Sequence, residues 1–101
     1  MKEIQKKTDR WIKKNTKGYW RPMSIMLRAA EETGELAREI NCRFGDKPRK
    51  SGEDGREIGQ EIADIIFTLT CLANSLKIDL DKEFNKMLRK YTVRDKGRHK
   101  R

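Results

Sequence analysis

Carboxylate side chains recur at helical spacing in two stretches of this 101-residue sequence, 31–39 (EETGELARE) and 61–64 (EIAD). At 100° per residue, the acids in and around each stretch form a narrow stripe along one face of a helix. Both stripes border apolar faces that are expected to pack inward, and isoleucines flank the second stripe on both sides. The first stripe consists of Arg28, Glu32, Glu35 and Glu39, and the second of Glu57, Glu61, Asp64 and Thr68.

So many carboxylates side by side need positive charge among them. Two like charges about 4 Å apart repel by ~1 kcal/mol in water and by ~4 kcal/mol at an effective dielectric of 20. Arg28 and Arg38 can neutralise two acids at most. A hard cation that binds oxygen ligands and shares its coordination shell with phosphates would supply this positive charge. This indicates Mg²⁺, with Mn²⁺ as a substitute. The sequence therefore predicts a metal site between two facing helices.

A solvated helix face is the alternative interpretation of these acids. In that case they pair with arginines three or four residues away, as Glu39 could pair with Arg43. This suits the first stripe taken alone, but it suits the second less well because of the flanking isoleucines. The one histidine, His99, lies near the C-terminus, so neither a zinc site nor a di-iron site of the Glu-x-x-His kind is expected.

The composition is typical of one small, basic, cytoplasmic domain. With 35% hydrophobic and 41% charged residues, a single chain buries a thin core, so association of identical chains through helix packing is expected. The formal net charge is +9, yet the basic residues gather toward both ends and the acids in the middle. This distribution suits a polyphosphate bridged by cations better than a nucleic acid. No apolar run is long enough for a membrane span or a signal peptide.

Helical periodicity and breakers predict an all-α fold with four helices that position the two stripes. The third has the strongest apolar periodicity, and the last is expected to begin at the N-cap residue Asp79. Together the helices are expected to form one domain over residues 1–95, followed by a basic tail over 96–101. The predicted helices span about 2–15, Pro22 to Gly45, about 56–76, and Asp79 to about 95, with a loop over 43–55.

The acidic pattern resembles the EExxE…ExxD signature of the MazG-like, all-α nucleoside triphosphate pyrophosphohydrolases. Glu31, Glu32 and Glu35 match its first half, and Glu61 and Asp64 match its second half after twenty-five intervening residues. The resemblance runs over nearly the whole chain. It implies a four-helix protomer that forms homodimers or homotetramers. It also implies cleavage of a nucleotide between its α and β phosphates, as in clearing surplus nucleotides from the cellular pool.

The resemblance also implies roles for individual acids. The positions of Glu32, Glu35, Glu61 and Asp64 would hold magnesium. Glu31 lies beside these positions but off their stripe. It is therefore expected to orient or deprotonate the attacking water.

Contacts to the phosphates are expected from basic side chains in two other segments. The last helix carries Lys86, Lys90 and Arg94 at intervals of four residues, and we favour Lys90 and Arg94 as the cations that act on the triphosphate. Lys47 belongs to the loop over 43–55, which could close over the triphosphate as a lid.

Base recognition is expected from the aromatic segment before the first acidic helix. Tyr19 and Trp20 offer ring faces on which any nucleobase can stack. Trp11 shares helical spacing with Ile4, and we expect it in the core instead.

Two further functions are left open by the sequence. Related all-α enzymes act on phosphoribosyl-ATP in histidine synthesis, which would change the substrate but keep the fold. A basic helical module that binds nucleic acid through its termini is the alternative from a different class. Its binding would be salt-sensitive and would survive Glu61→Gln and Asp64→Asn, because counterion release does not involve those acids.

Overall fold

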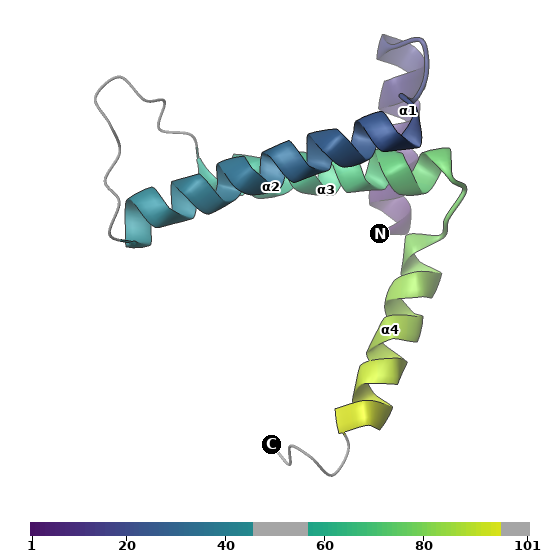
Figure 1. The fold of residues 1–101 in the computed structure, drawn as a ribbon. Helices are drawn as coiled ribbons and strands as arrows, with labels where there is room; N and C mark the ends of the chain where they lie inside the picture. The colour runs from purple at the N-terminus through teal and green to yellow at the C-terminus, as the bar shows by residue number, and fades with distance from the viewer. Residues whose placement is uncertain (46–56, 96–101) are drawn as a thin grey trace.

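The computed structural model describes residues 1–45 and 57–95, which form four α-helices and no strand (Figure 1). The predicted all-α, four-helix protomer is confirmed. Residues 46–56, with the predicted lid and its Lys47, and the tail over 96–101 lie outside the described residues. The four helices are α1 (Lys2–Asn15), α2 (Pro22–Phe44), α3 (Ile58–Ser75) and α4 (Leu80–Asp95).

Local sequence signals account for the helix ends. Pro22 occupies the first turn of α2, where its missing N–H costs nothing. Asp79 caps α4 as predicted, since its Oδ1 accepts a hydrogen bond from the Lys82 backbone N–H at 3.2 Å. Between α3 and α4, Lys77 adopts a φ of 57°, and the next N–H, of Ile78, bonds back to a carbonyl of α3. This left-handed residue turns the chain sharply out of α3.

The helices form an open arrangement around one antiparallel pair. α2 and α3 lie side by side along most of their length, and α1 crosses the end where α2 begins and α3 stops (Figure 1). From that same end α4 points away from the pair, and within the described ranges its main contacts are with α1. None of the helices in these ranges is long and apolar enough to cross a membrane.

The buried apolar core lies where α1, α2 and α3 meet. Ile12, Ile25 and Cys71 are its buried members, and Tyr19 and Leu72 pack against them. This core is small because a large fraction of the residues in the sequence is charged.

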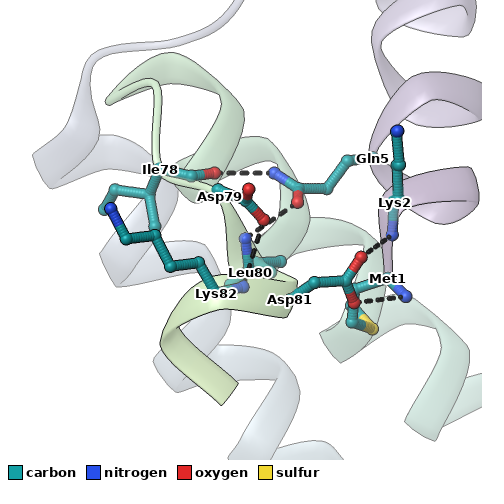
Figure 2. Close-up of polar contacts among 8 residues, drawn as sticks. All are labelled: Met1, Lys2, Gln5, Ile78, Asp79, Leu80, Asp81 and Lys82. Carbon is teal, nitrogen blue, oxygen red and sulfur yellow. Dashed lines mark hydrogen bonds and ion pairs between the residues drawn. The ribbon is translucent and has the colours of Figure 1, made fainter. Parts of the chain in front are cut away.

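A polar junction fixes the direction of α4 relative to α1 (Figure 2). Gln5 Oε1 accepts a hydrogen bond from the Leu80 N–H at 2.9 Å, at the start of α4. In return, Asp81 Oδ2 accepts one from the Lys2 N–H at 2.9 Å, at the start of α1. Backbone N–H groups in a first helical turn have no partner within their own helix. Each helix therefore supplies a side-chain acceptor to the first turn of the other.

Candidate active site

A pocket of about 400 Å³ opens between α1, the loop after it, the first half of α2 and the middle of α3. Its lining combines charged groups with aromatic rings, a mixture suited to a ligand that has both a charged and a planar part. The polar side chains that line it are Arg28, Glu32, Asp64 and Thr68, and the aromatic ones are Trp11, Tyr19, Trp20 and Phe67.

Glu32 is held at the α2–α3 interface by a neighbour from each helix. It is 3% exposed, and its Oε1 accepts a hydrogen bond of 2.5 Å from Thr68 Oγ1. Its Oε2 lies 3.6 Å from the Nε of Arg28, one turn earlier on α2. The carboxylate is thus fixed in the pocket wall by two different partners.

The bond between Glu32 and Thr68 marks the register of the antiparallel pair, because it joins one residue of each helix. Glu35 lies one turn after Glu32 in α2, and Asp64 lies one turn before Thr68 in α3. Because the two helices run in opposite directions, Glu35 and Asp64 lie at about the same level along the pair. Glu61 lies two turns of α3, or ~11 Å, from the level of Glu32 and Thr68. Its side chain is 1% exposed. The acids are therefore spread along the helix pair.

The predicted metal ligands differ in their surroundings. Glu32 and Glu61 are buried, Asp64 is half-buried and lines the pocket, and Glu35 is exposed. Within residues 1–45 and 57–95, no three acidic, histidine or cysteine side chains are already gathered around one point. An all-carboxylate donor set nevertheless fits a hard cation such as Mg²⁺. The ligand set stays a prediction.

Two other acids of the first stretch form ion pairs with arginines, as the solvated-face interpretation expects. Glu39 forms the expected ion pair with Arg43, with Oε1 and Nε 3.1 Å apart, yet Glu39 is buried. The sequence placed Glu39 on the same stripe as Glu32, beside a face expected to pack inward, but did not single it out as a site residue. Glu31 is exposed, and its Oε2 lies 3.8 Å from Nη1 of Arg28.

The prediction that Trp11 belongs to the core is wrong. Trp11 is 51% exposed and lines the pocket, where its ring meets Phe67 edge to face with centroids 5.8 Å apart. Trp20, which is 65% exposed, lines the same pocket. Phe67 was not predicted as a site residue, although its place between Asp64 and Thr68 on α3 could have indicated it.

Tyr19 lines the pocket but is anchored by its hydroxyl. The hydroxyl donates to Asp9 Oδ1 at 2.7 Å and accepts a hydrogen bond from Asn74 Nδ2 at 3.0 Å. Burial, followed by the bond to Asp9, raises the pKa of Tyr19 to about 12. Hydrogen bonds from Lys13 and then Tyr19 lower the pKa of Asp9. Tyr19 thus ties the loop after α1 to both α1 and α3, while Trp20 presents more of its surface for stacking.

The raised pKa of Tyr19 predicts a loss of stability in alkali. The native protein favours the neutral phenol, so this contribution is present below about pH 10 and disappears as the pH rises through about 12. We expect the free energy of unfolding to fall more steeply over this range in the wild type than in Tyr19→Phe. Urea titrations at several pH values would measure it, with Tyr91→Phe as the matched control. Equal slopes for the wild type and Tyr19→Phe would contradict the prediction.

Three of the basic residues predicted to contact phosphate lie on α4, which contributes none of its described residues to the pocket lining. Lys86, Lys90 and Arg94 are exposed on α4, and none of them lines the pocket. The guanidinium of Arg94 lies over the ring of Tyr91, 4.7 Å from its centroid. Their roles stay predictions.

Known proteins share both sequence and fold with this chain. Residues 21–99 match the model of the MazG nucleotide pyrophosphohydrolase domain. The uncharacterized protein YpjD of Bacillus subtilis (strain 168) is 47% identical over 98 residues, which cover 97% of this chain and 88% of YpjD.

Two crystal structures superpose on the fold. The structure of YPJD from Bacillus subtilis has a TM-score of 0.84 at 44% sequence identity. The superposition covers 94% of this chain and 95% of the YPJD chain. That of the Bacillus-conserved MazG protein, a nucleotide pyrophosphohydrolase, has a TM-score of 0.76 at 39% identity, with coverage of 89% and 86%.

Proposed function

Because this chain belongs to the MazG nucleotide pyrophosphohydrolase family, we propose that it cuts a nucleoside triphosphate, of the ribose or deoxyribose series, with the help of magnesium. The bond cut joins the α and β phosphates, and the products are the monophosphate and pyrophosphate. One observation carries the proposal: the carboxylates of Glu32 and Asp64 share a pocket with the exposed rings of Trp11 and Trp20. A nucleotide needs both kinds of contact.

In this proposal Glu32, Glu35, Glu61 and Asp64 hold the cation. Magnesium, when bound there, would screen the charge of the phosphates and lower the pKa of a water molecule that it binds. Manganese can substitute for it. Glu31, which is exposed beside Glu32, accepts a proton from the attacking water.

The aromatic side chains of the pocket position the other end of the nucleotide. The faces of Trp11 and Trp20 are accessible enough for a base to stack on them. Tyr19 holds the loop that carries Trp20, since its hydroxyl bonds to Asp9 and Asn74. Stacking tolerates several bases, which suits an enzyme that clears surplus nucleotides from the cytoplasm.

We also propose that the protomer forms a homodimer or homotetramer. Phe84, Leu88 and Tyr91 follow each other at three- and four-residue intervals along α4, and all three are exposed. Burial of such a stripe against a second copy removes apolar surface from water, at ~25 cal/mol per Å².

A product assay tests the proposed activity. We expect the wild type to release pyrophosphate and a monophosphate from at least one member of a panel of ribo- and deoxyribonucleoside triphosphates. Turnover should require Mg²⁺ or Mn²⁺ and stop when EDTA is added. Phosphoribosyl-ATP belongs in the panel because turnover of it alone would favour the specialised enzyme. Release of orthophosphate, or no turnover of any compound, would contradict the proposal.

A further inference from the structure

Arg28 is the one cationic side chain among the described residues that line the pocket. It lies on α2, one turn before Glu32, and reaches two acids of the EExxE pattern. Its Nε is 3.6 Å from Glu32 Oε2, and its Nη1 is 3.8 Å from Glu31 Oε2. Arg28 thus supplies positive charge where the sequence indicates that a cation is needed.

The contacts of Arg28 are looser than those of its main partner. Both of its distances exceed the ~3.2 Å limit of a normal N–H···O hydrogen bond, so they are ion pairs only. Glu32, in contrast, is buried and bonded to Thr68 through its other oxygen. The Arg28 side chain is 45% exposed. The guanidinium can therefore leave Glu32, while Glu32 stays in place.

We propose that Arg28 is an exchangeable counter-ion of this pocket. In the metal-free protein it pairs with Glu31 and Glu32, and when a divalent cation binds Glu32 it turns to the phosphates of the nucleotide. The inference rests on the proposed function and adds a phosphate-binding residue to it.

Charge and geometry support both halves of this exchange. A divalent cation bound to Glu32 repels a guanidinium less than 4 Å from the same carboxylate. The planar fork of a guanidinium matches two phosphate oxygens at once, which a lysine ammonium cannot do. Arg28 also lines the pocket itself, whereas Lys86, Lys90 and Arg94 are placed on α4.

The exchange predicts that Arg28→Gln changes two affinities in opposite directions. Without its competitor, the divalent cation should bind about two- to fivefold more tightly in the absence of nucleotide, because an ion pair whose arginine is half-exposed opposes it by up to ~1 kcal/mol. The KM for the triphosphate should rise by roughly tenfold or more, since a charge-assisted hydrogen bond is lost. A residue that only maintained the fold would weaken both.

Titration calorimetry with Mg²⁺, and Mn²⁺ binding followed by electron paramagnetic resonance, measure the first affinity without any turnover. Steady-state kinetics at saturating metal measure the second. Arg28→Lys keeps the charge but lacks the fork, so its metal affinity should match the wild type while its KM rises. Arg10→Gln removes an equal charge from α1, outside the pocket lining, and should change neither affinity by more than about twofold.

Each possible result decides one part of the proposal. Metal binding by Arg28→Gln that is no tighter than that of Arg10→Gln overturns the exchange. Tighter metal binding with an unchanged KM overturns the phosphate contact. Failure of the proposed function is a separate result, namely no turnover by the wild type, and the calorimetric comparison then still tests the exchange.

Discussion

Asp64→Asn is expected to lower kcat by roughly 100-fold or more while the helices stay folded. Asparagine keeps the size of the side chain in the pocket wall but removes the negative charge that would attract the cation. Glu61→Gln should have a similar effect, because Glu61 lies one turn away on the same face of α3 and is 1% exposed. Pyrophosphate release at saturating Mg²⁺ measures the loss, and circular dichroism confirms the helix content.

A binding measurement separates lost chemistry from lost structure in these variants. Mg²⁺ should raise the melting temperature of the wild type, because it binds the native state, and should raise that of Asp64→Asn or Glu61→Gln much less. Glu3→Gln, at an exposed position of α1, is the matched control and should behave as the wild type. Full activity in either α3 variant would refute the predicted ligand set. Nucleic-acid binding that persists in inactive variants would instead favour the basic module.

Ile25→Ala should lower the free energy of unfolding by about 2 to 4 kcal/mol. Ile25 is 3% exposed and is one of the few buried apolar side chains that join α1, α2 and α3. In a domain of this size the change corresponds to a melting temperature lower by roughly 10–20 °C. The KM should also rise, because Ile25 lines the pocket.

The matched control for Ile25→Ala is Met23→Ala, two residues earlier on α2 and exposed. It should change the free energy of unfolding by less than about 0.5 kcal/mol. Urea unfolding at one fixed protein concentration would compare the two variants, since association of chains makes stability depend on concentration. Equal losses would show that the cluster of Ile12, Ile25 and Cys71 is not what holds the three helices together.

The helices themselves could be predicted because their signals are local. Periodic apolar residues, Pro22 at the start of α2 and Asp79 before α4 act within a few residues of where they occur. The direction of α4 could not be predicted, because it depends on hydrogen bonds between segments far apart in the chain. Gln5 with Leu80 and Asp81 with Lys2 form such bonds.

The site was predictable to the extent that burial follows from periodicity. Isoleucines around Glu61 indicated that this acid faces inward, and it is buried. Thr68 lies on the predicted stripe, but its hydrogen bond to Glu32 depends on the register of two helices, which no local signal contains. Trp11 was misplaced because spacing identifies the face of a helix but not how much of a large ring the neighbouring helices cover.

Both tryptophans of this chain, Trp11 and Trp20, line the same pocket. Their intrinsic fluorescence therefore arises entirely from this part of the molecule. A nucleobase that stacks on either indole would quench the emission, with no dye attached and no reaction required. Ligands could thus be ranked by simple titration in a cuvette, including compounds that the protein binds but does not hydrolyse.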